Sequence, residues 1–364
     1  MTDPRPVEDE RLFFLTLETT CDETGAAVLV GPRPPRTGVP VVLSSVVASQ
    51  VDLHERFGGV VPEIASREHV RQILPVIREA LDRAEVGLHQ IGMVAVATRP
   101  GLVGALVVGL TAAKALAVAL DVPLVAVDHL EGHLYACQLA HPDRDLYPFL
   151  GLVVSGGHTS LYSCRSPLEN QILGGTIDDA AGEAFDKVAS LLGLGYPGGA
   201  GIERAARSGH PRAYEFPRSF LHEDRLDFSF SGLKTAVLYA LQGQDARGGP
   251  RGDAPAPTPQ VVADVAASFQ EAVVDVLVGK TRQALERTGL KRVGVGGGVA
   301  ANRSFRDRME REIGRHGVEV VVPPMNLCTD NAAMAGIALA RLAAGEIADL
   351  DIDVTAGLVR PGRG

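Results

Sequence analysis

The sequence predicts an α/β fold built from two similar halves, and three observations lead to this prediction. Short apolar runs typical of buried strands alternate with longer segments of helical periodicity. Trp is absent and aromatic residues make up only 5% of the chain, while Gly occurs 41 times, which favours close helix–sheet packing. A comparable order of strands and helices starts twice along the chain, each time with two strand-like runs around a turn.

The first half is expected to follow the order β-β-β-α-β-α-β. Its strand-like runs are residues 12–17, 26–30, 41–48, 91–97 and 123–127, and its helices are residues 67–84 and a segment that starts at Pro100-Gly101. The most apolar stretch, residues 101–120, is interrupted by Lys114 and closed by Asp121. We therefore expect a buried helix there and not a membrane span.

The second half is expected to open with a hairpin around a glycine-rich turn. Its predicted elements are strands at residues 149–154, 159–163, 292–295 and 318–322 and helices at residues 177–192, 261–287 and 330–344, the last with Thr329 or Asp330 near its N-cap. Such a duplicated order is typical of the actin-like ATPase and sugar kinase fold, in which two lobes flank a nucleotide cleft.

These patterns suggest a domain division. Residues 1–11 read as a disordered extension, residues 12–145 as an N-terminal actin-like lobe and residues 146–345 as a C-terminal actin-like lobe, followed by a tail at 346–364. We expect an insertion near residues 194–259, which includes the Gly/Pro-rich surface loop 243–259. The closing helix, residues 330–345, is expected to pack on the N-terminal lobe.

Composition excludes several classes of protein. The net charge of −9 provides no global basic field for nucleic acid, so an RNA substrate would need a local basic patch or a partner. Cys21, Cys137, Cys164 and Cys328 form no CxxC pair, which excludes a disulfide framework or a zinc ribbon. The acidic start has no apolar signal region, so a reducing cytoplasm is the expected compartment.

The run HLEGH offers a metal site. If residues 129–133 are helical, His129 and His133 lie one turn apart on one face, and Asp330 could add a carboxylate from the start of another helix. Two imidazoles and one carboxylate leave positions open on Zn²⁺ or Fe²⁺. The plain alternative is a polar helix face. The zinc-protease motif HExxH is disfavoured because Leu130, not a glutamate, follows His129.

Two glycine-rich turns are candidates for holding a phosphate. SGGHT starts at Ser155 between two strand-like runs, and GGGVAANRSF follows a strand and opens a helix, with Asn302 offering an amide. Asp186 could bind ribose hydroxyls, and Gly198 and Gly199 would let the backbone approach a ligand. Ordinary tight turns and a solvated acidic helix face are the alternatives.

The acidic turn after the first strand carries Asp22 and Glu23. In an actin-like fold this turn faces the cleft, where Asp22 could position a nucleophile or a metal-bound water, or act as a base. The alternative is that Asp22 is there for turn formation alone.

Together these segments resemble one family, the universal tRNA N6-adenosine threonylcarbamoyltransferases in their bacterial form (TsaD, formerly described as O-sialoglycoprotein endopeptidases). The resemblance covers residues 12–340 and is carried, in order, by ETTCDETGAAV, VVPEIASREH, TRPGLVGALVVG, HLEGHLYA, LVVSGGHTSL, DDAAGEAFDKVASLLGLGYPGG, FSFSGLKTA, GGVAANR and CTDNAAM. Thr20 stands where the family usually has Ser, and we expect this departure, like the N-terminal extension, to touch no proposed ligand.

The resemblance implies an actin-like fold and a divalent metal, Fe²⁺ favoured and Zn²⁺ possible, bound by His129, His133 and Asp330. It implies a catalytic role for Asp22. It also implies that threonylcarbamoyl-adenylate contacts the following residues: Val153, Val154, Ser155, Gly156, Gly157, Asp186, Gly199 and Asn302. The implied partners are tRNA, a paralogous actin-like subunit and a small ATPase.

The expected reaction is transfer of the threonylcarbamoyl group to N6 of adenosine 37 in tRNAs that read ANN codons, with release of AMP. The alternatives are an actin-like ATPase or kinase without tRNA modification activity, a scaffolding actin-like protein, and a protease. Candidate basic residues for RNA are Arg67, Arg71, Arg204, Arg207, Arg212, Arg218, Arg225 and Lys234.

Overall fold

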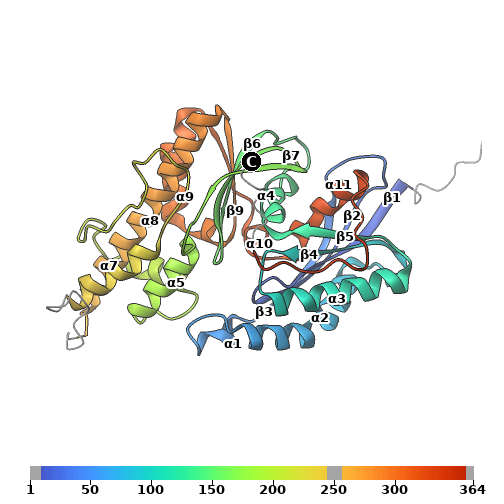
Figure 1. Ribbon diagram of the computed structural model, residues 1–364, viewed down its shortest axis with the longest axis horizontal. Coiled ribbons are helices and arrows are strands. Elements are labelled where there is room, and N and C mark those ends of the chain that lie inside the picture. The colour runs from blue at the N-terminus through green and yellow to red at the C-terminus, as the bar shows by residue number, and fades with distance from the viewer. Residues whose placement is uncertain (1–9, 244–255, 358–364) are drawn as a thin grey trace, which may run out of the picture. The chain divides into compact units, whose positions relative to one another are not determined.

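The computed structural model describes residues 10–243 and 256–357 (Figure 1). The chain divides into two compact units: unit 1 is Met1–Asp52, Val60–Leu146 and Pro323–Gly364, and unit 2 is Leu53–Gly59 and Tyr147–Val322. The predicted disordered extension falls on residues outside the described part, except Glu10 and Arg11. Most of the predicted surface loop, residues 244–255, also lies outside it.

Unit 1 is built on a mixed five-stranded sheet in the order β3-β2-β1-β4-β5. The strands are β1 (Arg11–Glu18), β2 (Glu23–Pro32), β3 (Val41–Ser49), β4 (Ile91–Arg99) and β5 (Leu124–Asp128). The first three form an antiparallel meander, and β4 and β5 run parallel to β1. Because side chains alternate along a strand, Leu15 and Leu17 point to one face of the sheet and Thr16 and Glu18 to the other.

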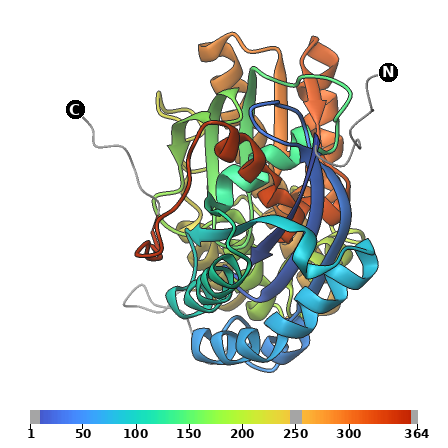
Figure 2. The ribbon, with the colours of Figure 1, turned by 90° about the vertical axis from the view of Figure 1, so that its right-hand side faces the viewer.

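Helices α2 (Pro62–Ala84) and α3 (Val103–Leu120) cover the face to which Leu15 and Leu17 point (Figure 2). The other face receives α4 (His129–Leu139), the 3₁₀ helix η5 (Ala332–Ile337) and α11 (Ala338–Ala343), with the short α10 (Met325–Cys328) beside α4. Thr16 donates a hydrogen bond to the Ala332 carbonyl at 2.7 Å and so anchors η5 on the sheet.

Helix α3 is long and apolar enough to span a membrane by length and composition alone. In unit 1 it contributes Leu106, Leu110, Ala113 and other residues to the buried core, so the predicted burial holds for one face of the helix. The Lys114 ammonium donates to the Ile352 carbonyl at 2.6 Å, and Ile352 itself packs against the same core. One face of α3 therefore belongs to the core of unit 1, while only 33% of the helix is buried and Val103, Val107 and Val118 are exposed.

Unit 2 repeats the sheet topology of unit 1, in the order β10-β9-β6-β7-β8. Its strands are β6 (Phe149–Val154), β7 (Thr159–Ser166), β8 (Glu169–Gly175), β9 (Arg292–Gly296) and β10 (Glu319–Val321). Strands β6, β7 and β8 form an antiparallel meander, and β9 and β10 run parallel to β6. The two sheets correspond strand for strand, which confirms the predicted duplication, although β8 was not part of the prediction.

The remaining elements of unit 2 are mostly helical. They are α1 (Val51–Glu55, which begins in unit 1), α5 (Ala181–Leu191), α6 (Gly198–Ala206), α7 (Ser231–Gln242), α8 (Pro259–Thr288), the 3₁₀ helix η3 (Gly298–Ala301), α9 (Arg303–Glu312) and the 3₁₀ helix η4 (Gly314–His316). In unit 1 the 3₁₀ helix η2 (Leu88–Gln90) precedes β4. The half-buried Arg308 of α9 pairs with Glu271 and Asp275 of α8, which fixes these helices together.

Three sequence expectations about elements were wrong in detail. Strand β8 was not predicted, because the segment ENQILGG has neither a clear alternation nor a β-branched run. The helix expected from residue 177 begins at Ala181, since Asp178 is used to bind the start of α7. The closing helix expected from Asp330 is the 3₁₀ helix η5 followed by α11, and its N-cap is Asn331.

Candidate metal centre and substrate-binding turns

Helix α4 carries both histidines of the predicted metal site, so the condition on which that prediction rested, a helical segment, is met. The helix begins directly after β5, where Asp128 accepts hydrogen bonds from the backbone N–H groups of Leu130, at 2.9 Å, and Glu131. This N-cap orients the first turn. His129 and His133 then lie on one helix face, with ring centroids 4.6 Å apart.

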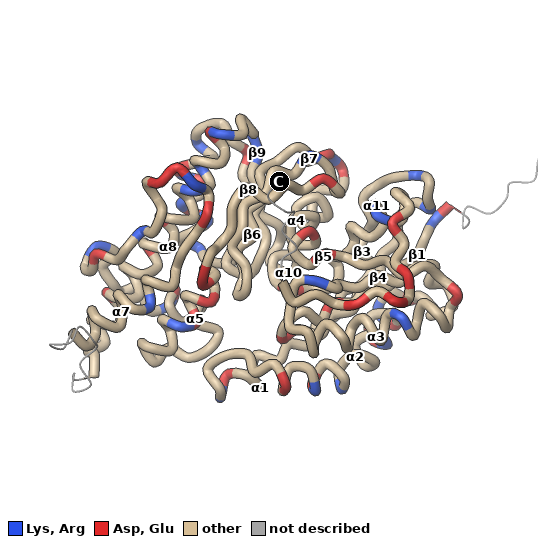
Figure 3. Tube along the Cα trace, in the orientation of Figure 1, with Lys and Arg blue, Asp and Glu red and all other residues tan. Residues whose placement is uncertain are grey.

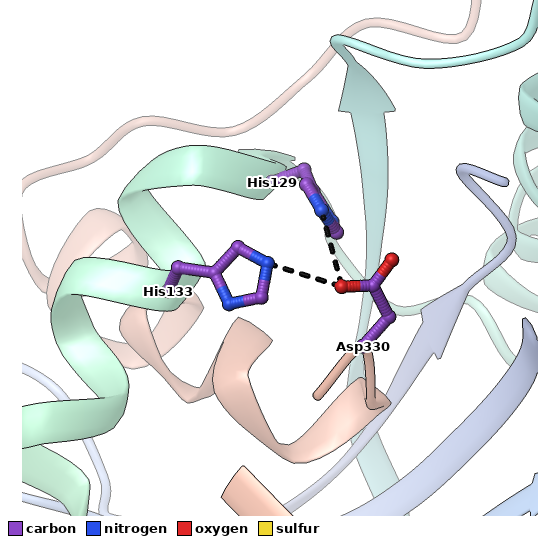
Figure 4. Close-up of side chains that lie close together, drawn as sticks. All are labelled: His129, His133 and Asp330. Atoms are coloured by element: carbon purple, nitrogen blue, oxygen red, sulfur yellow. Dashed lines mark ion pairs between the residues drawn. The ribbon is translucent and has the colours of Figure 1, made fainter. Parts of the chain in front are cut away.

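Asp330 comes from the turn between α10 and η5. Because Asn331 caps η5, accepting from the Met334 N–H at 3.2 Å, the Asp330 carboxylate is not the cap. It points toward the two rings instead (Figure 4): its Oδ1 lies 3.1 Å from His133 Nε2 and 3.6 Å from His129 Nε2. The correction of the N-cap therefore explains how Asp330 reaches the histidines.

The three side chains are compatible with a single divalent ion, since their ligand atoms all lie within 4.8 Å of one another. Ligand bonds of about 2.0–2.2 Å place neighbouring ligand atoms about 3–3.5 Å apart, close to the two separations from Asp330. The His133 ring is fully buried, yet neither of its nitrogens has a hydrogen-bond partner among the described residues, since its approach to Asp330 lacks hydrogen-bond geometry. A buried imidazole without a partner is costly unless an ion binds it.

A buried carboxylate, Glu18, holds the other side of the His129 ring. Glu18 Oε2 lies 3.1 Å from His129 Nδ1, and the Thr20 hydroxyl lies 3.3 Å from the same nitrogen. Burial alone would lower the pKa of His129, but Glu18 and Asp330 raise it to about 9.

The expectation that Thr20 touches no proposed ligand was wrong, because its hydroxyl lies beside the ring of His129. Glu18 was missed, because its only local signal is its place at the end of a buried strand.

The acidic turn predicted at Asp22 and Glu23 lies in the same unit. Asp22 is only 7% exposed, and its carbonyl accepts from the Gln50 N–H at 3.0 Å. Burial, followed by the charges of Asp330 and Asp22, raises the pKa of Glu23 well above its usual range. Burial also raises the pKa of the Cys21 thiol, and the charges of Asp22 and Asp330 raise it further. This turn therefore shares the electrostatic environment of the metal site.

In unit 2 the two predicted glycine-rich turns meet. Val153 and Val154 end β6, and Ser155, Gly156 and Gly157 form the turn to β7. Gly297 has a φ of +96°, and a Cβ there would collide with the Val154 carbonyl oxygen. Only glycine tolerates both this backbone conformation and this approach.

Gly156, Gly157 and Gly199 differ from Gly297. A Cβ on any of the three would meet no atom within 4 Å, so there is open space beside their backbones, as a ligand requires. Packing within the protein does not demand glycine at these positions.

Asp186 and Asn302 already bind other parts of unit 2. Asp186 Oδ1 accepts from the Gly198 N–H at 2.7 Å, which ties α5 to the first turn of α6. Asn302 caps α9 by accepting from the Phe305 N–H at 2.9 Å, and its amide nitrogen donates to Gln270 at 2.8 Å. These contacts fix the two side chains, and Asn302 in particular uses its amide to hold the fold.

A cavity that the sequence did not reveal lies among α6, α8 and α9. Its volume is about 610 Å³, and Gln270, the partner of Asn302, is part of its wall. The other residues in its lining are Glu203, Ala206, Arg207, Glu271, Arg303, Ser304, Asp307, Arg308 and Arg311. The lining does not include Gly199 or Asn302 themselves, but Glu203 lies one helical turn after Gly199, and Gln270 is hydrogen-bonded to Asn302.

The predicted basic residues are only partly available for RNA. Arg218 pairs with Asp275 at 2.9 Å, Arg225 with Asp227 at 2.7 Å and Arg71 with Glu68 at 3.3 Å. Figure 3 shows basic and acidic positions interspersed within each unit.

The fold and the site together define an actin-like protein with a group of two histidines and one aspartate that could hold a metal ion. A family model described as TsaD, tRNA N6-adenosine threonylcarbamoyltransferase, matches residues 41–337. This chain belongs to that family.

Several curated relatives carry the same description. The protein from Rhodopirellula baltica is 50% identical over 358 residues, covering 96% of this chain and 97% of the relative. The protein from Symbiobacterium thermophilum is 53% identical over 349 residues, covering 95% of this chain and 96% of the relative. Both are named tRNA N6-adenosine threonylcarbamoyltransferase.

Solved structures at low sequence identity show the fold. T. kodakarensis HypF aligns with a TM-score of 0.58 at 14% identity, covering 92% of this chain and 48% of HypF. Component A of the Acidaminococcus fermentans (R)-2-hydroxyglutaryl-CoA dehydratase aligns with a TM-score of 0.50 at 14% identity, covering 92% of this chain and 99% of that chain. These likenesses support the actin-like fold and nothing more specific.

Proposed function

We propose that this protein transfers the threonylcarbamoyl group of threonylcarbamoyl-adenylate to N6 of adenosine 37 in tRNAs that read ANN codons, with release of AMP. Membership of the TsaD family carries the proposal. The group formed by His129, His133 and Asp330 supports it, since actin-like ATPases and kinases hold Mg²⁺ mainly through carboxylates, phosphates and water. An actin-like ATPase or kinase without tRNA modification activity is the disfavoured alternative.

His129, His133 and Asp330 are proposed to hold one divalent ion, with Fe²⁺ favoured over Zn²⁺. Two imidazoles and one carboxylate with open positions are typical of non-haem Fe(II) sites, although zinc accepts the same ligands. When bound, the ion supplies Lewis-acid polarisation and a template that orients the adenylate.

Unit 2 is proposed to bind the adenylate. The open backbones of Gly156 and Gly157 offer N–H groups for the phosphate, and Val153, Val154 and Ser155 shape that turn. Asp186, Gly199 and Asn302 are proposed to contact the nucleoside. The cavity beside Gln270 is of the size that small ligands occupy, and we propose that it takes part of the adenosine.

The transfer step is a substitution at the carbamoyl carbon. The N6 nitrogen of adenosine forms a bond to this carbon, the bond from the carbon to the phosphate oxygen breaks, and AMP leaves. Asp22 is proposed to accept the proton that the amine loses. An aromatic amine is a weak nucleophile, so a large part of the acceleration must come from holding the two substrates in reacting geometry.

The remaining expectations concern the partner proteins of the enzyme and its location in the cell. We propose that a paralogous actin-like subunit and a small ATPase assist it and complete the tRNA site, because the net charge is −9 and several candidate arginines are already paired. We also propose a cytoplasmic location, which the proposed tRNA substrate supports.

The test is transfer of labelled threonine into unmodified tRNA, using the purified protein, its candidate partners and enzymatically made threonylcarbamoyl-adenylate. Wild-type protein should transfer label, and the His129→Ala/His133→Ala protein should not. His141→Ala is the matched control, because His141 follows the same helix and its ring contacts the Cys137 carbonyl, away from the proposed ligands. No transfer by wild type, together with ATP hydrolysis indifferent to the histidines, would instead support the ATPase alternative.

A further inference from the structure

Glu18 is a buried carboxylate to which the proposed function assigns no role. It is the last residue of β1 and only 1% exposed. Both of its oxygens are engaged: Oε1 accepts from the Thr20 N–H at 2.8 Å, and Oε2 lies 3.1 Å from His129 Nδ1. A Cβ at Gly25 would lie 3.3 Å from the Glu18 Cβ, so the strand pairing also restricts its position.

This arrangement determines which nitrogen of His129 can bind a metal. A carboxylate beside Nδ1 favours a proton on that nitrogen, and the lone pair of the neutral ring then lies on Nε2. Nε2 is the nitrogen that faces Asp330, at 3.6 Å. His133 has no such contact, because its Nδ1 lacks a hydrogen-bond partner among the described residues.

We propose that Glu18 is a positioning residue that fixes the tautomer and ring orientation of His129, so that His129 binds the metal through Nε2. The inference rests on the metal site within the proposed function, but it does not depend on the transfer reaction. A carboxylate behind an imidazole ligand also makes the ring a stronger ligand, and loss of such a partner typically weakens metal binding about 10–100-fold.

The two oxygens of Glu18 make a glutamine substitution informative. In the Glu18→Gln variant the side chain keeps a single carbonyl oxygen, and the Thr20 N–H needs an acceptor. Once that oxygen accepts from Thr20, the new amide nitrogen faces His129 Nδ1 and donates to it. The His129 proton then moves to Nε2, the atom that should bind the metal. Alanine removes the carboxylate without imposing the wrong tautomer.

The experiment is a titration of the metal-free protein with Co²⁺, followed by the visible absorption of the bound ion. We expect Glu18→Gln to weaken Co²⁺ binding by about 10–100-fold and Glu18→Ala to weaken it less than Glu18→Gln does. Glu131→Gln should stay within about threefold of wild type. It is the matched control because Glu131 lies on α4 but pairs with Arg341, which also pairs with Glu346.

The order of the two Glu18 variants separates positioning from a merely structural role. If Glu18 only supported the Thr20 backbone, the isosteric glutamine would be the milder change. Weaker binding by Glu18→Gln than by Glu18→Ala supports the proposal. Equal or milder loss in Glu18→Gln, or both variants within threefold of wild type, overturns it. Wild-type protein that binds no Co²⁺ would overturn it together with the metal site. Wild-type protein that binds Co²⁺ but transfers no threonylcarbamoyl group would overturn the proposed transfer scheme, and the order of the two Glu18 variants would still decide the role of Glu18.

Discussion

The turns that follow β1 and β6 occupy equivalent places in two sheets of the same topology, yet they have opposite chemistry. The end of β1 and the turn after it are rich in side-chain functional groups, with Glu18, Thr20 and Asp22 all buried. The turn after β6 presents backbone, because Gly156 and Gly157 have open space beside them. A duplicated fold therefore fixes where a site can form, while the residues in each turn decide whether side chains or backbone groups are presented there.

The comparison predicts its largest effect at Asp330. Asp330→Asn removes the only carboxylate of the group formed with His129 and His133. We expect metal affinity to fall by more than about 100-fold, since loss of a supporting partner alone costs about 10–100-fold, and transfer activity to fall with it. Chelation of wild-type protein should have the same effect, reversed by adding Fe²⁺. Asp351→Asn is the control, because Asp351 is exposed and lies in the same unit, and its metal content should match that of wild type. Unchanged metal content in Asp330→Asn would refute the proposed metal site.

The next effect concerns the proposed base. Asp22→Asn keeps the size of the side chain but cannot accept the amine proton, so we expect kcat to fall about 10²–10⁴-fold with metal content unchanged. Single-turnover transfer with preloaded metal and adenylate would measure the step directly. Full activity in this variant would leave Asp22 as a turn residue only.

A third prediction concerns stability in unit 2. Gly297→Ala places a methyl group against the Val154 carbonyl at a φ of +96°, so we expect a loss of about 2–4 kcal/mol in the free energy of unfolding. Gly193→Ala is the control, because Gly193 has a φ of +67° but open space around it, and should lose about 1 kcal/mol. Urea titrations of both variants would measure the two free energies of unfolding. Equal losses of stability would show that the backbone shifts to avoid the Val154 carbonyl at little cost in free energy.

The open glycines should behave differently from Gly297. Gly156→Ala is expected to leave the urea midpoint unchanged, since its Cβ meets no protein atom within 4 Å. The added methyl group should still obstruct the phosphate and raise the KM for threonylcarbamoyl-adenylate about tenfold, which corresponds to about 1.4 kcal/mol of binding. Gly232→Ala, which also has open space but lies at the start of α7, should change neither quantity. An unchanged KM in Gly156→Ala would argue against the phosphate cradle.

The sequence was informative where structure depends on near neighbours. The buried run at residues 91–97 became β4, and the long segment of helical pattern at residues 261–287 became α8. His129 and His133 were paired correctly because four residues along a helix is a local relation. Asp330 was identified as a ligand candidate although its local role was wrong, since the better N-cap was the next residue, Asn331.

What the sequence did not show depends on contacts between distant segments. Glu18 meets a side chain 111 residues away, and nothing in its own neighbourhood predicts that contact. Asp178 was expected to lie in a helix, but its side chain binds the 229–231 segment, more than 50 residues later in the chain. The helix therefore begins only after Asp178, at Ala181. The cavity among α6, α8 and α9 likewise needs three helices to be placed before it exists.

The smallest predicted effect is on the stability of unit 2. It tests whether a carboxylate there, Asp178, stabilises a turn of the backbone, whereas Glu18 in unit 1 is proposed to orient a histidine. Asp178 accepts hydrogen bonds from the Phe230 N–H at 2.8 Å and from the Ser229 and Ser231 hydroxyls at 2.6 and 2.8 Å. Burial raises the pKa of Asp178, but these bonds outweigh it and hold the pKa below its usual range. The ionised carboxylate therefore stabilises the fold above the pKa of the unfolded chain, about 3.9.

This stabilisation should disappear as the pH falls through the lower pKa of the folded state, because both states then bind the proton. We expect Asp178→Asn to reduce the free energy of unfolding of the metal-free protein by about 1 kcal/mol at pH 7. The difference from wild type should shrink toward zero below about pH 4, measured by urea titration from pH 3 to pH 7. Asp224→Asn, at a 99% exposed carboxylate paired with Arg287, should stay within about 0.5 kcal/mol throughout. Because Asp178 contacts no proposed metal ligand, Co²⁺ affinity should not change in Asp178→Asn. A changed affinity would contradict the idea that Asp178 in unit 2 stabilises only the backbone while Glu18 in unit 1 supports a metal ligand.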